Sequence, residues 1–257
     1  MKLHQLNGYL QSFYIAEYEK GLILLDGLSR PDIEILERYI KEDLSRNMKD
    51  LKLIICTHPH PDHAGAAYYL RDKYDIEIAT HQDFNLWYKG LSGFIKHQIE
   101  IQLAHLSALL KGVKWKKLYY PRFIKTETLL KDGDVIPGFN DWSVIVTAGH
   151  TNCDISLYHK DTNQVYVGDL FIMLKNKASP PIPVTYTKTY KESLTKIIEL
   201  DATRLLLAHK GIKSVKKETL IQLRDTFRDI PFNNFIRSLM IARSFLNRKI
   251  RRFFPRS

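Results

Sequence analysis

Short runs of apolar residues recur along the chain and are separated by polar or turn-forming residues. Runs of this length, rich in Val, Ile and Leu, are typical of buried β-strands. Residues 7–18 and 22–25 predict two strands joined by a tight turn at Gly21. Further strands are predicted at 51–56, 77–80, 142–147, 155–159, 164–167 and 204–208.

Apolar residues at helical spacing lie between several of these runs. They predict a helix at 33–44 behind Pro31 and another at 64–74. The residues from Thr189 to Glu192 fit a capping box that opens a third helix, ending at Leu200. Because strands and helices alternate in blocks, we expect an α/β fold with mixed rather than purely parallel sheets.

The segment 84–125 is strongly apolar and predicts one or two helices, broken near Gly90–Gly93 and ending near Gly112. One interpretation makes it a lid over a pocket for an apolar acyl group. The other makes it a packing element, against the core or against a second copy in a homodimer.

The composition is that of a globular protein. The chain has 257 residues, of which 44% are hydrophobic and 26% charged, which argues against extensive disorder. Its two cysteines, Cys56 and Cys153, are too few for a disulfide scaffold. No run of about 18 apolar residues predicts a membrane span. The first residues lack a basic region followed by an apolar one, so we expect no secretory signal and a cytoplasmic protein.

Positive charge is concentrated near the C-terminus. The formal net charge is +11, and residues 231–257 contain seven Arg or Lys and no acid. We therefore divide the chain into a main domain, 1–218, and a basic amphipathic helical extension, 219–257. This extension could dock on the domain, lie on an anionic membrane as a peripheral contact, or bind nucleic-acid phosphates.

A dense group of metal-binding residue types follows the predicted strand 51–56. It reads His58-x-His60-x-Asp62-His63, and its two prolines argue for a loop rather than a helix. In an extended segment residues i and i+2 point the same way, so His58 and His60 can bind one metal ion. A turn then directs Asp62 and His63 towards a second. Imidazole and carboxylate ligands suit Zn²⁺, and also Fe or Mn.

Three further candidates each come directly after a predicted strand. They are His150 in Ala148-Gly149-His150-Thr151, Asp169 after Gly168, and His209 in Ala208-His209-Lys210-Gly211. Loops at strand ends are where protein scaffolds present ligands. We therefore expect these residues to join the histidine motif.

With these motifs, the chain resembles the metallo-β-lactamase fold superfamily, in its glyoxalase II-like and lactonase-like hydrolase branch. The matching pieces occur in family order between residue 7 and about residue 211: Asn7 to Leu10, Leu24 to Asp26, Thr57 to Gly65, Ala148 to Thr151, Gly168-Asp169 and Ala208 to Gly211. The resemblance implies an αββα sandwich of two mixed β-sheets flanked by helices, with a dinuclear metal site at one edge.

The resemblance also implies a role for each site residue. His58, His60 and His150 resemble the ligands of the first metal ion. Asp62, His63 and His209 resemble those of the second. Asp169 resembles the carboxylate that bridges the two ions, and Asp26 a residue that orients the site from behind the ligands.

Several details separate branches of the superfamily. Asp169 resembles the bridging aspartate of the broad hydrolases, which the true β-lactamases lack. A complete second ligand set argues against the single-iron persulfide dioxygenases. No arginine and lysine pattern marks a glutathione thioester site, which argues against glyoxalase II itself. Cys153 lies where many relatives have Thr-Pro-Gly-Ser, and we interpret it as a small buried residue, with a sulfur ligand or redox role as the alternative.

The implied activity is hydrolysis of an ester, thioester or lactone in a small, apolar-acyl substrate. A hydroxide bridging two divalent ions, zinc in the first instance, would attack the carbonyl carbon, and Asp62 would orient it and shuttle its proton. The first alternative is a metallo-phosphodiesterase or nuclease, which the basic extension would suit. The second is a mononuclear iron sulfur oxygenase on the same fold.

Overall fold

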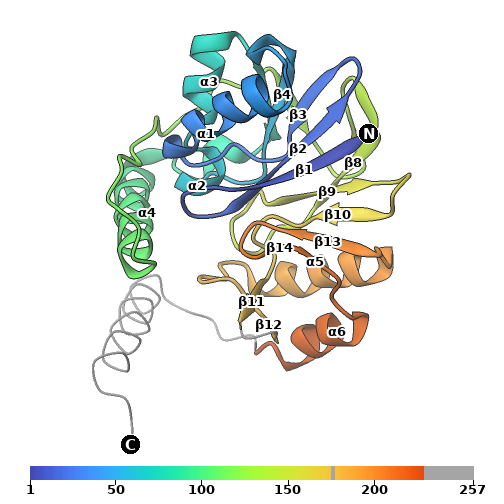
Figure 1. Cartoon of the computed structure of the whole chain (residues 1–257). Coiled ribbons are helices and arrows are strands. Elements are labelled where there is room, and N and C mark those ends of the chain that lie inside the picture. Colours follow the sequence, from blue (N-terminus) through green and yellow to red (C-terminus); the bar gives the residue numbers. More distant parts are fainter. Residues whose placement is uncertain (175–176, 229–257) are drawn as a thin grey trace, which may run out of the picture.

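Two β-sheets packed face to face form the centre of the molecule, as the computed structural model shows (Figure 1). The structure describes residues 1–174 and 177–228. The first sheet has the order β1 (Lys2–Asn7), β2 (Ser12–Tyr18), β3 (Gly21–Leu24), β4 (Leu51–Cys56), β5 (Glu77–His81) and β6 (Thr128–Leu130). Strands β1 to β3 are antiparallel and β3 to β6 are parallel, so this sheet is mixed.

The second sheet is also mixed, because β10 and β13 pair in parallel while the other neighbours are antiparallel. Its order is β14 (Gly211–Lys213), β13 (Arg204–Leu207), β10 (Gln164–Tyr166), β9 (Ile155–His159), β8 (Phe139–Val146) and β7 (Val135–Ile136). A separate two-stranded ribbon pairs β11 (Ile172–Leu174) with β12 (Lys177–Ser179).

Helices cover the outer face of each sheet. On the first sheet lie α1 (Ile33–Arg38), extended by a π-turn at Tyr39–Asp43, then α2 (Pro61–Ala64) and α3 (Ala67–Tyr74). On the second lie α5 (Thr187–Leu200) and α6 (Lys217–Thr226). Short 3₁₀ turns occur at Arg30–Asp32, Met48–Asp50 and Phe84–Leu86. The four layers confirm the predicted αββα sandwich.

Strand periodicity explains how one chain makes three apolar layers. Leu53 and Ile55 of β4 face the second sheet, whereas Ile54 between them faces the helices. Successive side chains of a strand point to opposite faces, so a continuous apolar run is buried on both sides. The same rule places Trp142 and Leu157 of the second sheet in the layer between the sheets.

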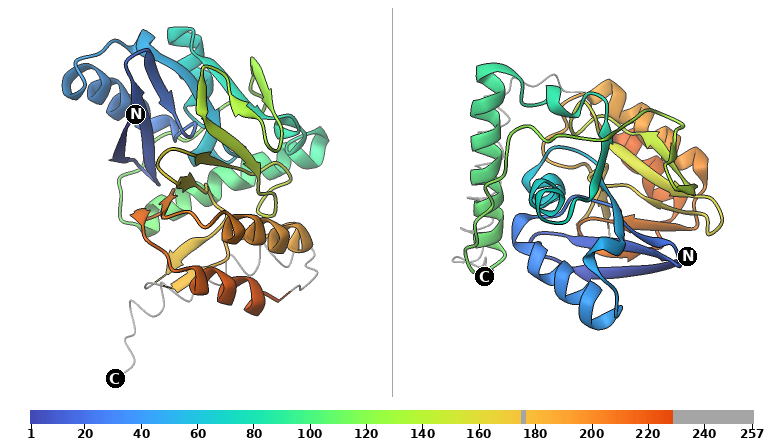
Figure 2. Two further views of the ribbon diagram at one scale, coloured as in Figure 1. Left: turned by 90° about the vertical axis from the view of Figure 1, so that its right-hand side faces the viewer. Right: turned by 90° about the horizontal axis from the view of Figure 1, so that it is seen from above.

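Helix α4 (Gly90–Leu110) stands beside these layers (Figures 1 and 2). The predicted helix end near Gly112 is confirmed, since α4 ends at Leu110 and is followed by Gly112 at φ +72°. That left-handed conformation favours glycine and ends the helix. The predicted break near Gly90–Gly93 is instead the start of the helix, which runs unbroken through Gly93, and residues 111–125 are not helical. Among the described residues, no helix is long and apolar enough to cross a membrane.

Two local predictions were wrong. The prolines of the histidine motif do not exclude a helix, because Pro61 is the first residue of α2, where its missing N–H costs nothing. The capping box is also absent: α5 begins at Thr187, and its N-cap residue, Tyr186, makes no side-chain cap hydrogen bond. Thr189 therefore lies inside the first turn.

The predicted division at 218/219 falls within α6. Leu220 and Leu223 of this helix are buried in the same apolar cluster as Leu194 and Ile198 of α5. Residues 229–257, which make up most of the predicted basic extension, lie outside the described residues.

Leu157→Ala should lower the free energy of unfolding by about 2–5 kcal/mol, because the side chain is fully buried between the sheets and its loss leaves a cavity. Leu129→Ala deletes the same atoms from a side chain that is 58% exposed, and should change the stability by no more than about 0.5 kcal/mol. Urea unfolding of both variants measures the difference. Equal effects would contradict this placement of the core.

Candidate metal centre

Loops at one edge of the sandwich bring the seven predicted ligands together. The histidine motif follows β4, His150 follows β8, Asp169 follows β10 and His209 follows β13. Among the described residues, His and Asp side chains form three overlapping groups, and within each group the candidate ligand atoms lie within 4.8 Å of one another. The groups are His58, His60 and His150; His58, His63 and Asp169; and Asp62, His63 and His209.

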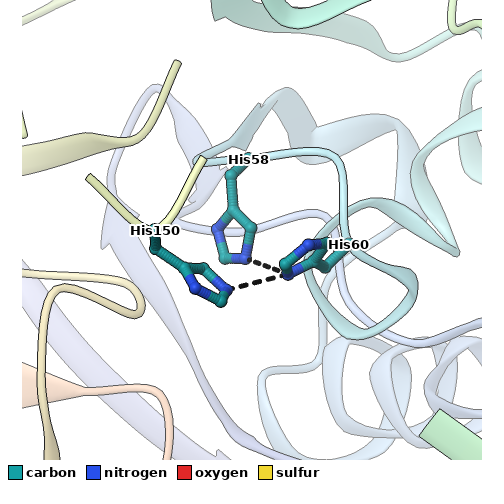
Figure 3. Close-up of side chains that lie close together, drawn as sticks. All are labelled: His58, His60 and His150. Atoms are coloured by element: carbon teal, nitrogen blue, oxygen red, sulfur yellow. Dashed lines mark hydrogen bonds between the residues drawn. The ribbon is translucent and has the colours of Figure 1, made fainter. Parts of the chain in front are cut away.

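The first group consists of three imidazoles whose nitrogens converge (Figure 3). His60 Nδ1 lies 3.1 Å from His58 Nε2 and 2.9 Å from His150 Nε2. Burial, followed by the neighbouring imidazoles, holds the pKa of His58 well below its ordinary value. Burial and His60 likewise lower the pKa of His150. Both rings are therefore neutral near pH 7, the state in which a histidine can bind a metal.

The third group, Asp62, His63 and His209, combines a carboxylate with two imidazoles. Asp62 Oδ2 lies 3.8 Å from His63 Nε2 and 3.7 Å from His209 Nε2. Burial alone lowers the pKa of His63, but the carboxylates of Asp26, Asp169 and Asp62 raise it well above its ordinary value. The negative charge gathered around this ring also favours a cation at the same place.

Asp169, from the remaining group, lies between the first and the third. Its Oδ1 is 3.4 Å from His63 Nε2 and 3.3 Å from His209 Nε2, while its Oδ2 is 3.8 Å from His150 Nε2. Burial opposes its charge, but His209 and His63 hold its pKa well below the ordinary value. One oxygen therefore faces each group, as a bridging carboxylate requires.

Two buried atoms at this centre have no hydrogen-bond partner in the part of the chain that the structure describes. They are His63 Nε2 and Asp169 Oδ1, which lie 3.4 Å apart. Leaving buried polar atoms unpaired is costly, so such atoms indicate an unmet ligand. Five imidazoles and two carboxylates match the donors that Zn²⁺, Fe or Mn accept. The residues present therefore fit a divalent metal centre.

The second ring nitrogen of each of the five candidate histidines also has a polar partner in the chain. Metal-binding imidazoles usually donate their other N–H to a carboxylate or carbonyl, which fixes the ring and its tautomer. The partners here are the Thr57 hydroxyl for His58, the Glu100 carboxylate for His60, Asp26 for His63, the Pro183 carbonyl for His150 and the Leu10 carbonyl for His209.

Asp26 is the most extensively bonded of these partners. His63 Nδ1 donates to its Oδ2 at 2.5 Å, and the Tyr166 hydroxyl donates to the same oxygen at 2.6 Å. Gly27 N and Thr57 N donate to Oδ1 at 3.0 and 3.1 Å, and the Thr57 hydroxyl lies 3.0 Å from Oδ2. The residue is 1% exposed. The predicted orienting role of Asp26 requires contact with a candidate ligand, which its hydrogen bond to His63 provides.

Sequence reasoning missed Glu100. This residue of α4 places Oε2 3.4 Å from His60 Nε2 and also accepts hydrogen bonds from the Tyr88 hydroxyl and Trp87 Nε1. A sequence signal existed, since Glu100 is the one acidic residue in 84–125. The apolar pattern of the segment did not predict that this carboxylate would lie beside the candidate ligand His60.

Cys153 is a buried free thiol, as interpreted from the sequence. Its Sγ lies 3.5 Å from the Thr151 hydroxyl. Burial, with Asp154 nearby, raises the pKa of this thiol well above its ordinary value. Within residues 1–174 and 177–228 it belongs to none of the three ligand groups.

Known proteins resemble this protein both in sequence and in fold. A family model described as the metallo-beta-lactamase superfamily matches residues 6–209. A curated relative from Bacillus subtilis (strain 168), "Probable metallo-hydrolase YqjP", is 28% identical over 228 residues, covering 79% of this chain and 68% of the relative.

Two solved structures share the fold. The metallo-beta-lactamase family protein TTHA1429 from Thermus thermophilus superposes with a TM-score of 0.66 at 17% identity, covering 93% of this chain and 87% of its own. TTHA1623, solved in a di-iron-bound form, gives a TM-score of 0.59 at 20% identity, covering 85% and 96%.

Asp26→Ala should lower the free energy of unfolding of the metal-free protein by about 3–5 kcal/mol, because it leaves buried His63 without its counter-charge and several donors unpaired. Thr57→Val removes one hydroxyl from the same cluster and should cost only about 1 kcal/mol. Denaturant unfolding in a chelator measures both. A cost below that of Thr57→Val would contradict the role of Asp26.

Proposed function

The chain belongs to the metallo-β-lactamase superfamily, and on this premise we propose that it is a dinuclear metal-dependent hydrolase of a small ester, thioester or lactone. The proposal includes membership of the glyoxalase II-like and lactonase-like branch of the superfamily. The observation that carries the proposal is the position of Asp169, with one oxygen towards each of two complete ligand groups. A centre that binds a single ion would need only one of these groups.

Zinc is the proposed metal, with iron or manganese as alternatives. The donor set suits all three, the relative YqjP is named a metallo-hydrolase, and TTHA1623 binds two irons. When bound, such ions lower the pKa of water and polarise a carbonyl oxygen. His58, His60 and His150 would hold one ion, and Asp62, His63 and His209 the other, with Asp169 contacting both.

The chain's own contribution is orientation. Because His63 donates its Nδ1–H to Asp26, the neutral ring carries its lone pair on Nε2, which faces the centre. The Pro183 and Leu10 carbonyls do the same for His150 and His209. Rings held in this way need no rearrangement when the reaction proceeds.

Asp62 is the proposed proton-handling residue. Its side chain is 18% exposed, whereas those of the neighbouring His63 and His58 are fully buried. A carboxylate at the open side of the centre can orient the attacking water and carry its proton to the leaving group.

An aromatic wall beside the first group supports an apolar acyl substrate. The Trp87 and His60 rings lie 6.2 Å apart. Tyr88 and Tyr120 are buried with their hydroxyls 3.1 Å apart; that of Tyr88 donates to Glu100 and that of Tyr120 to the Pro59 carbonyl. All three aromatic residues come from the segment 84–125. We infer that this segment forms one side of the substrate site, as the predicted lid would.

Metal content and turnover, measured on the same preparation, test this proposal. Protein purified without added metal should contain two divalent ions per chain and hydrolyse members of a panel of lactones, aryl esters and acyl thioesters. Asp169→Ala should lose the metal and the turnover together, whereas Asp161→Ala, at an exposed turn, should keep both.

Other results would favour the alternatives. A single iron per chain would favour the mononuclear oxygenase. Turnover of phosphodiesters alone would favour the phosphodiesterase, since the same donors can serve both reactions. Either result contradicts hydrolysis of carbonyl substrates.

Glu100→Gln should weaken metal binding by about 10- to 100-fold, because it removes the charge that faces His60 Nε2 while keeping the side-chain volume. Glu127→Gln is the matched control: Glu127 pairs with Arg71 near the surface, and its loss should leave metal affinity unchanged. Titration against a chromophoric chelator measures both. Equal affinities in the two variants would show that Glu100 does not position His60.

A further inference from the structure

Helix α4 has two opposite faces. Gly93, His97, Ile101 and Ala108 are buried towards the domain. Leu91, Ile95 and Leu109 recur at helical spacing on the other side and are 77%, 51% and 68% exposed. The helix stands beside the sandwich (Figures 1 and 2), and the loop that follows it contacts it through Trp115, stacked on His105, and Arg122, bonded to the Gly90 carbonyl. The exposure of Leu91, Ile95 and Leu109 shows that the described residues leave these side chains uncovered.

Exposed apolar side chains are concentrated on this segment. Of the sixteen large hydrophobic side chains exposed among the described residues, ten belong to 84–125. Single exposed apolar residues are ordinary, but a cluster of them indicates an interaction surface. The ten are Leu86, Leu91, Phe94, Ile95, Ile99, Leu109, Val113, Trp115, Tyr119 and Phe123.

The same segment is strongly basic. It contains eight lysines or arginines, and its one acid, Glu100, is directed inwards to His60. The basic residues are Lys89, Lys96, Lys111, Lys114, Lys116, Lys117, Arg122 and Lys125. Arg122 lies over the rings of Phe94 and Phe123, with its Cζ 5.7 and 4.5 Å from their centres. Positive charge and apolar surface therefore occur together.

The combination of apolar side chains and positive charge limits which partner can cover the outer face of α4. Residues 231–257 carry seven basic residues and no acid, so they would be repelled by the segment 84–125, and a second copy of α4 would be repelled as well. Nucleic-acid phosphates would pair with the lysines but leave Leu91, Ile95 and Leu109 in water. An anionic lipid surface accepts both the apolar side chains and the charges.

We propose that the outer face of α4, together with the loop through Phe123, is the surface by which this protein lies on an anionic membrane. The apolar side chains enter the region between headgroups and acyl chains, and the flanking lysines contact the headgroups. This inference does not depend on the proposed hydrolase activity. It also differs from a contact through the C-terminal extension, because the residues that carry it are in the described part of the chain.

Trp115 reports on this contact in the unmodified chain. The protein has three tryptophans, of which Trp115 is 73% exposed while Trp87 and Trp142 are 7% and 0% exposed. With vesicles of phosphatidylcholine containing about one third phosphatidylglycerol, the emission should shift to shorter wavelength and be quenched by brominated acyl chains. Trp115→Phe should abolish the quenching without abolishing binding. Residues 229–257 contain no tryptophan, so their binding alone would not produce the signal.

A triple variant tests the apolar face directly. Leu91→Gln, Ile95→Gln and Leu109→Gln together should reduce co-sedimentation with these vesicles by at least about tenfold, since they remove apolar side chains without changing charge. The control pair Leu129→Gln and Val135→Gln alters side chains that are 58% and 47% exposed elsewhere, and should bind as the unmodified chain does. Circular dichroism and urea unfolding check that both variants are folded.

Three results would overturn the proposal. The first is no binding of the unmodified chain to anionic vesicles. The second is binding without quenching of Trp115, or equal binding of the triple variant, either of which would assign the contact to another part of the chain. The third is a dimer in sedimentation equilibrium that the triple variant converts to a monomer without a change in vesicle binding, which would make the face a contact between copies.

Discussion

The geometry of the candidate metal centre depends on the hydrogen bonds of the buried Asp26 carboxylate, because they join both sheets and the histidine loop at one point. Asp26 follows β3, and its donors come from the end of β4, from α2 and from β10 in the opposite sheet. An exposed ion pair contributes little, but a buried acceptor with this many donors fixes each of them in place. His63 is thereby positioned by the fold itself, before any metal is bound.

The central strands and the candidate metal ligands could be predicted from the sequence. The prediction for β4 has the observed limits, because a six-residue apolar run buried on both faces has few alternatives. The seven candidate ligands are brought together because each lies at a strand end on the same edge, a position that can be inferred once the strands are known. The short edge strands β6, β7 and β14 were not predicted, since two or three residues at a sheet edge carry little apolar pattern.

The groups that hydrogen-bond the candidate ligands were harder to predict from the sequence, for a physical reason. The Leu10 and Pro183 carbonyls that hold His209 and His150 are backbone groups, which every residue carries and no side-chain pattern marks. Glu100 lies forty positions after His60, and only the packing of α4 brings them together. The error at Pro61 has a different origin: proline breaks a helix interior but suits its first position, and a motif that ends in a helix contains both cases.

The two faces of helix α4 are subject to different physical constraints. Its inner face is fixed by packing and by Glu100, which approaches a ligand of the candidate centre. The stability of the domain does not require apolar residues on the outer face. Leu91 and Leu109 remain largely exposed to water there, so they contribute little hydrophobic stabilisation on folding. Polar residues there would serve the isolated fold equally well and would lower the tendency to aggregate. Apolar side chains at these positions, among lysines and beside an exposed tryptophan, are therefore accounted for by a partner that is both apolar and negatively charged.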